Sequence, residues 1–169
     1  MQNLEIYAEI FIGFVGFSGI VAALGAVNNR NWTVVDKTRF ILLIGCSFLG
    51  VFLSLIPSVI QQFNAGEKPN WQIATGIFST ISSIALISVV LLFKRNNLFG
   101  HPDFSMRFMV TVGCIVSTFI LGAGLSALGV YFEATMGIYM VGLMCVMFIS
   151  ASMFGLLVKF ILRDVRVEK

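Results

Sequence analysis

The stretch FILLIGCSFLGVFLSLIPSVI, residues 40–60, contains no charged side chain and decides the fold class. It is as long as the roughly 20 apolar residues that a helix needs to cross the hydrocarbon core of a bilayer. The rest of the sequence has a similar composition: 58% of the 169 residues are hydrophobic, 11% are charged, and the mean hydropathy is +0.97. Soluble domains carry far more charge. The chain is therefore predicted to be an integral membrane protein.

Apolar runs of spanning length occur at about residues 4–27, 38–63, 71–94, 105–132 and 135–162. Continuous apolar runs favour helices, because the strands of a membrane barrel would show short alternating segments. The connections between the runs are too short to hold a soluble domain. We predict an all-α integral membrane protein in which five transmembrane helices form a single transmembrane domain over residues 1–169.

Basic residues indicate the orientation, because they keep the loops that carry them in the cytoplasm. They flank the first connection, the third connection and the C-terminal segment: Arg30, Lys37, Arg39, Lys94, Arg95, Arg107, Lys159, Arg163, Arg166 and Lys169. The second connection has Lys68 beside Glu67, the fourth has Glu133, and MQNLEIYAE at the start has no basic residue. We predict that the N-terminus is outside, the C-terminus is cytoplasmic, and the membrane is the plasma (inner) membrane. The net charge of +3 is interpreted as a topology signal, and no nucleic-acid partner is expected.

Two segments resemble each other at the start of the second and fourth runs. RFILLIGC at 39–46 and RFMVTVGC at 107–114 share Arg-Phe and Gly-Cys at the same spacing. This similarity predicts a duplicated helical hairpin followed by a fifth helix.

Glu9 is the leading candidate for a functional side chain. It lies about 7 Å inside the first apolar run, at the helical rise of roughly 1.5 Å per residue. An ionised carboxylate at that depth is costly against lipid, so we expect it to face the bundle interior or water. Gly13 and Gly16 share its helical face and, with Gly122 and Gly129 in the fourth run, are predicted to allow close helix packing.

Polar side chains follow one face in the outer parts of the second and third runs: Ser54, Ser58, Gln61, Gln72, Thr75, Ser79 and Ser82. With Glu9 they are predicted to line a path open to the outside. Leu86 follows Ser82 on the same helical face of the third run and is the predicted gate of this path. Pro57 is a predicted hinge, because it cannot donate to the carbonyl of Leu53. The hydroxyl of Ser54 is a candidate partner for that carbonyl.

Aromatic residues gather near the ends of the runs and are interpreted as anchors at the membrane interface: Tyr7, Trp32, Trp71, Tyr131 and Tyr139. Methionines recur along the fifth run, where they offer a flexible apolar surface for packing: Met136, Met140, Met144, Met147 and Met153.

These patterns predict an oligomeric membrane channel or small carrier for cations, with an acidic outer vestibule and a hydroxyl-lined path. The acidic rim would comprise Glu5, Glu9, Glu67 and Glu133. The alternative is a non-catalytic membrane scaffold or accessory subunit, in which the hydroxyls bond backbone carbonyls or neighbouring helices. The expected partners are the lipid bilayer, further copies of the chain and a small ion.

The sequence gives no indication of an enzyme. It contains no phosphate-binding loop, HExxH motif or nucleophile elbow. His101 is its one histidine, and Cys46, Cys114 and Cys145 are far apart without metal-ligand spacing. We therefore predict no enzymatic activity, no cofactor and no metal site.

Overall fold

The computed structural model describes residues 2–27, 32–62, 67–100, 106–130 and 135–167. The regular structure in these ranges is helical: α1 (Gln2–Val27), α2 (Val34–Gln61), α3 (Glu67–Arg95), the 3-10 helix η1 (Leu98–Gly100), α4 (Met106–Ala127) and α5 (Met136–Val167). Five helices are long and apolar enough to cross a membrane, over Leu4–Ala23, Val34–Gln61, Asn70–Arg95, Val110–Ala127 and Met136–Lys159. The protein is thus a helical multi-pass membrane protein, as its composition predicted.

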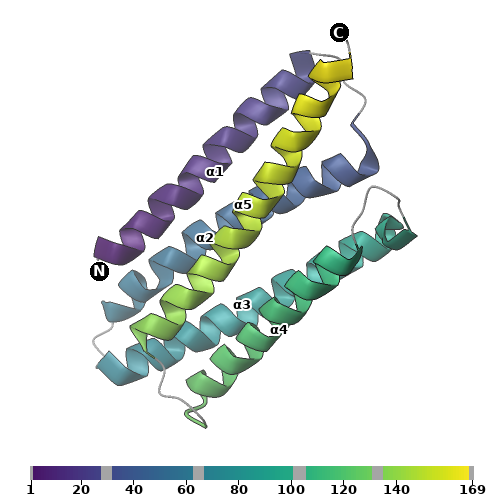
Figure 1. Ribbon diagram of the computed structural model, residues 1–169. Coiled ribbons are helices and arrows are strands. Elements are labelled where there is room, and N and C mark those ends of the chain that lie inside the picture. The colour runs from purple at the N-terminus through teal and green to yellow at the C-terminus, as the bar shows by residue number, and fades with distance from the viewer. Residues whose placement is uncertain (1, 28–31, 63–66, 101–105, 131–134, 168–169) are drawn as a thin grey trace.

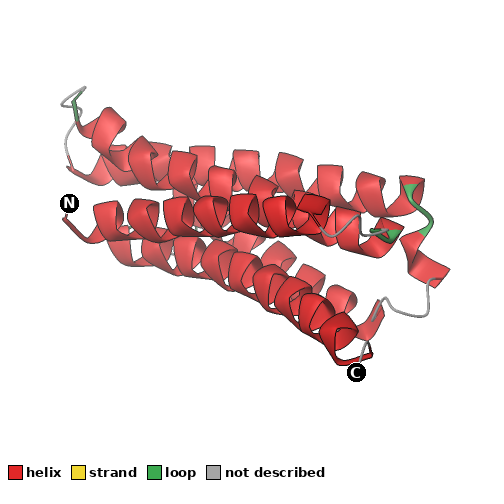
Figure 2. Cartoon of the chain, turned by 90° about the horizontal axis from the view of Figure 1, so that it is seen from above, coloured by secondary structure: helices red, strands yellow, loops and turns green. Residues whose placement is uncertain are grey.

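The long helices run along a common direction and alternate up and down (Figures 1 and 2). The central helix is α2, which packs against α1, α3 and α5, whereas α4 packs chiefly on α3. One end of the bundle, called here the basic end, carries the described residues Lys37, Arg39, Lys94, Arg95 and Lys159. The opposite end, called the acidic end, carries Glu5 and Glu9.

A side-chain cap begins α2 four residues before the predicted start of the span. Thr33 is the N-cap: its hydroxyl oxygen accepts from the backbone N–H of Asp36 at 3.2 Å, and its O–H donates to the Asp36 carboxylate. Arg39 then forms an ion pair with Asp36 at 3.4 Å, although the Asp36 side chain is only 2% exposed. The carboxylate therefore stabilises the first turn, where the helix dipole also favours negative charge.

Gly129 ends α4 earlier than the apolar run predicts. Its φ of +70° is a left-handed conformation that favours glycine. The N–H of Gly129 donates to the carbonyl of Ser126 at 3.0 Å, and that of Val130 donates to Leu125 at 3.1 Å. These bonds satisfy carbonyls that the end of the helix leaves free. Gly129 thus stops the helix at Ala127 and does not lie within it.

The buried side chains form two clusters along the bundle. The cluster nearer the acidic end joins α1, α2, α3 and α5 through Leu4, Phe11, Leu53, Ile60, Trp71, Ala74, Phe78, Tyr139, Leu143 and Val146. The cluster at the basic end comprises Val35, Leu42, Leu43, Phe93, Leu98, Met153 and Leu157. Helices α2, α3 and α5 contribute to both clusters, so their side chains connect the two ends of the core.

Tyr139 links α5 to the position in α2 where Pro57 interrupts the backbone hydrogen bonds. Pro57 has no N–H, so the carbonyl of Leu53 loses its usual helical donor. The Tyr139 hydroxyl donates to that carbonyl at 2.5 Å. Ser54 instead donates to the carbonyl of Val51 at 2.8 Å, so its predicted role as the partner of Leu53 is wrong.

The interpretation of Tyr139 as an interface anchor is also wrong, because only 1% of this side chain is exposed. Its ring packs against Trp71 and Phe78, with centroid separations of 6.1 and 5.3 Å. Trp71 is itself only 8% exposed. The two aromatic residues belong to the core, where Tyr139 supplies both apolar area and a hydrogen-bond donor.

Two antiparallel helix pairs, α1 with α2 and α3 with α4, pack closely. This arrangement is compatible with a repeated hairpin followed by α5. Arg39 forms the ion pair already described, whereas the side chain of Arg107 lies outside the described residues. The duplication stays a prediction.

Tyr139→Phe should lower the free energy of unfolding by about 1 kcal/mol, because it removes the donor to the Leu53 carbonyl. In a Pro57→Ala background the loss should be smaller, since the alanine supplies the missing backbone N–H. Reversible unfolding in mixed micelles of a mild detergent and dodecyl sulfate measures both losses. Equal losses in the two backgrounds would show that Tyr139 does not compensate for Pro57.

Candidate functional site

Glu9 lies on the outer surface of α1 at the acidic end. The side chain is exposed, whereas Leu4, Ala8 and Phe11 on the opposite face are buried. Glu5 is also exposed, four residues earlier on the same helical face as Glu9. Within the protomer Glu9 therefore does not face the bundle interior, and the structure does not bring it together with the hydroxyls of α2 and α3.

Glycines continue this surface of α1. A Cβ atom added at Gly13, Gly16 or Gly19 would meet nothing within 4 Å. Inside the protomer, close helix contact occurs at other glycines: Gly50 beside Phe11, Gly124 beside Ser79, and Gly142 beside Phe78 and Phe119. Gly122 likewise faces open space. The predicted packing role of Gly13, Gly16 and Gly122 can therefore apply only to contacts with another molecule.

None of the predicted path residues of α2 lines the apolar cavity described below. Ser54 is buried and donates to a carbonyl of its own helix. Ser58 and Gln61 are half-buried, and Pro57 is buried within a helix that continues to Gln61.

The polar face of α3 points partly toward α4. The Ser79 hydroxyl donates to the carbonyl of Ile120 at 3.0 Å. A Cβ atom added at Gly124 would lie 3.1 Å from the hydroxyl oxygen of Ser79. Thr75 is 1% exposed and its hydroxyl has no hydrogen-bond partner among the described residues, while Gln72 is exposed. At Ser79 the polar face of α3 therefore contributes to the α3–α4 contact and does not point toward the polar side chains of α2.

Most described hydroxyls in the helices donate to carbonyls three or four residues earlier. Examples are Ser47 to Leu43 at 2.7 Å and Ser83 to Ser79 at 2.7 Å. Thr80, Ser88, Thr118, Ser150 and Ser152 bond in the same way. Such a hydroxyl is satisfied without water. The hydroxyls that bond in this way are thus compatible with an apolar environment, whereas those of Thr75, Ser82 and Ser126 are buried without a partner among the described residues.

Ser82 and Leu86 line a cavity of about 570 Å³ bounded by α2, α3, α4 and α5. Its other walls are largely apolar, with Leu42 and Leu49 on α2, Val116 on α4 and Val146 on α5. No described acidic residue lines it. The predicted gate therefore stands in the wall of an apolar cavity and does not follow an acidic vestibule. Glu67 and Glu133, the remaining members of the predicted acidic rim, have side chains outside the described residues.

The three cysteines line this same cavity, from three different helices. Cys46 lies on α2, Cys114 on α4 and Cys145 on α5, and all three are free thiols. Their wide spacing in the sequence gave no indication of a common location. Among the described residues no three His, Cys, Asp or Glu side chains are close enough together to hold a metal ion.

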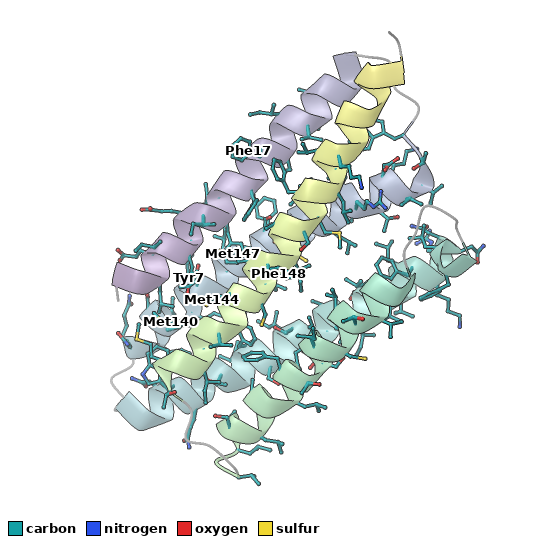
Figure 3. All side chains as sticks on the ribbon, in the orientation of Figure 1. Tyr7, Phe17, Met140, Met144, Met147 and Phe148 are labelled. Carbon is teal, nitrogen blue, oxygen red and sulfur yellow. The ribbon has the colours of Figure 1, made fainter. Side chains whose placement is uncertain are left out.

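The methionines of α5 lie in different surroundings, and Met153 belongs to the buried cluster at the basic end and lines the cavity. Figure 3 shows Tyr7 of α1 near Met140, Met144, Met147 and Phe148 of α5. Met140 and Met147 pack against the buried cluster at the acidic end, whereas Met144 and Phe148 are 52% and 64% exposed. Met140 and Met147 therefore take part in packing, as the sequence predicted for the methionines of this helix.

No protein-family model matches this chain, and no curated protein or solved structure matches it.

Gly124→Leu should reduce the free energy of unfolding by about 1–3 kcal/mol, because the larger side chain would be forced against Ser79 and would separate α4 from α3. Gly122→Leu, on the same helix but facing open space, is the matched control and should change stability by less than about 0.5 kcal/mol. The mixed-micelle unfolding assay compares the two variants. Similar losses in both would contradict the assigned α3–α4 contact.

Proposed function

We propose that this protein is a non-catalytic membrane subunit that works by assembly, and that the exposed face of α1 is its contact surface. The face comprises Glu5, Glu9, Gly13, Gly16 and Gly19. The observation that carries the proposal is the exposed carboxylate of Glu9, which lies within the apolar span Leu4–Ala23 and beside glycines that leave room for a further helix.

The physical reason is the cost of a carboxylate that faces lipid. Insertion scales assign about 3 kcal/mol to an aspartate at the centre of a membrane helix, with smaller values toward the interface. A neighbouring helix can replace lipid around Glu9 and supply a hydrogen-bond donor. Glycines let the two backbones approach closely, which is what helix association in membranes requires.

The hydroxyl pattern also favours assembly over transport through a single protomer. Ser54 and Ser79 are engaged with backbone carbonyls, and the cavity beside Ser82 is apolar. A cation crossing the protomer would need polar groups in place of its water. We propose the orientation expected from the basic residues, with α1 starting outside the plasma membrane and the basic end in the cytoplasm.

The double variant Gly13→Leu, Gly16→Leu should weaken self-association, because leucines would fill the space that a partner helix needs. A loss of about 1–2 kcal/mol corresponds to about a tenfold rise in the dissociation constant. Gly45→Leu is the matched control, since Gly45 is an exposed glycine of α2 with open space around it. Stepwise photobleaching of labelled protein diluted in liposomes counts the copies in each assembly.

The proposal also allows a partner of another sequence, so photocrosslinkers placed at positions 13 and 16 should capture protein in native membranes. A monomeric wild type whose crosslinkers capture lipid alone would refute the assembly function.

A cation path at the axis of an oligomer is the second candidate. It is favoured by Glu5 and Glu9, two exposed carboxylates on one face of α1. Symmetric association through this face would gather several carboxylates and concentrate cations there.

Potassium flux into proteoliposomes should then fall at least tenfold in Glu9→Gln, while photobleaching shows an unchanged number of copies. Glutamine removes the charge that flux needs but keeps a polar side chain that a partner helix can hydrogen-bond, so the two measurements separate the candidates. Absence of flux in an oligomeric wild type would remove the path and leave the assembly function.

A further inference from the structure

The apolar cavity lies between α3 and α4 on one side and α2 and α5 on the other. Helix α4 stays close to α3 but makes few contacts with α5, and the two diverge toward the basic end in Figure 1. The cavity of about 570 Å³ occupies this region. It lies within the range of roughly 300–1,000 Å³ that is typical of small-molecule sites.

The chemistry of the walls selects an apolar occupant. They include Leu42, Leu86, Val89, Val146 and Met153, and none of the described charged side chains contributes to them. Water would find few hydrogen-bond partners here, and apolar cavities accept apolar ligands. In a bilayer the most abundant apolar groups next to a helix are lipid acyl chains.

The length of the cavity suits one leaflet of the membrane. Its lining on α3 runs from Phe78 to Phe93, fifteen residues apart, which is about 22 Å along a helix. One leaflet contributes about 15 Å, half of the hydrocarbon thickness of roughly 30 Å. A chain that enters at the basic end can therefore stay within the cavity to the middle of the membrane.

The cavity reaches the basic end of the bundle, where α3 ends in two basic residues. Phe93 and Phe99 both line it, and their rings meet with a centroid separation of 6.3 Å. Between them in the sequence come Lys94 and Arg95, which are exposed. Neither forms an ion pair with any residue that the structure describes. Two cationic side chains at the end of α3 that the cavity reaches complement an anionic headgroup at the membrane surface.

We propose that the cavity is a binding site for one acyl chain of an anionic phospholipid, with the phosphate held by Lys94 and Arg95. The second acyl chain stays in the surrounding bilayer. The site uses α2, α3, α4 and α5, whereas the assembly surface uses α1, so either proposal can fail without the other.

Native mass spectrometry of the full chain tests the site. Delipidated protein is titrated with phosphatidylglycerol or with phosphatidylcholine of the same chain length. Phosphatidylglycerol should bind more tightly than phosphatidylcholine. The double variant Lys94→Gln, Arg95→Gln should lower the affinity for phosphatidylglycerol about fivefold for each lost charge. Because both residues are exposed, the variant should keep the fold. Equal affinity for the two lipids in the wild type, or unchanged selectivity in this variant, would refute the headgroup assignment.

A cavity-filling substitution tests the acyl-chain part. Gly113 lines the cavity, and a Cβ atom there would meet nothing within 4 Å. Gly113→Phe should weaken binding of both lipids about tenfold, the effect of losing about two buried methylene groups. Gly122→Phe, also on α4 but outside the cavity, should bind as the wild type does. The smaller Gly113→Leu serves if the phenylalanine variant does not fold. Equal binding by the Gly113 and Gly122 variants would refute the site.

The native cysteines provide an independent measurement, because Cys46, Cys114 and Cys145 all line the cavity. Labelling of the wild type by N-ethylmaleimide in detergent should slow severalfold when phosphatidylglycerol is added. The same addition should leave labelling of Gly113→Phe unchanged, since the lipid no longer enters. An unchanged labelling rate of the wild type after addition of the lipid would show that the bound chain lies elsewhere and would overturn the proposal.

Discussion

The bond between the Tyr139 hydroxyl and the Leu53 carbonyl satisfies a requirement that the membrane imposes on this protein. Every backbone carbonyl in hydrocarbon needs a donor, and Pro57 removes the one that Leu53 would have had. The replacement donor comes from α5, across the centre of the bundle. This bond holds α5 on α2, and the rings of Trp71 and Phe78 around it hold α5 on α3. Helix α2 also packs against α1 and α3.

The same requirement explains the hydroxyl-rich helices. A serine or threonine in a spanning helix can donate to the preceding turn, and Ser47, Ser83 and Thr118 all do so. Ser79 donates instead to α4, which makes it part of the α3–α4 contact. These groups stabilise helices and helix pairs at modest free energies, about 0.6 kcal/mol per interhelical contact. Polar content alone is therefore weak evidence for a path through the membrane.

Two features remain that internal packing does not use, and they lie on different helices. The exposed carboxylate of Glu9 and the open glycines of α1 face away from the bundle at its acidic end. The cavity between α4 and α5 extends toward the basic end, where Lys94 and Arg95 lie. One feature is polar and suits a protein partner, whereas the other is apolar and suits a lipid chain. Assembly and lipid binding can thus occur together in one molecule.

The sequence by itself determined the membrane class and the five spans, because length and hydropathy depend on local composition. It also located Pro57 and the carbonyl that this residue frees. It could not say which side chain would bond Leu53, which face of α1 would be covered, or that Cys46, Cys114 and Cys145 would meet around one cavity. Those outcomes depend on the rotation and register of helices against one another. In a uniformly apolar chain the hydrophobic pattern marks no preferred face, so only the tertiary packing decided them.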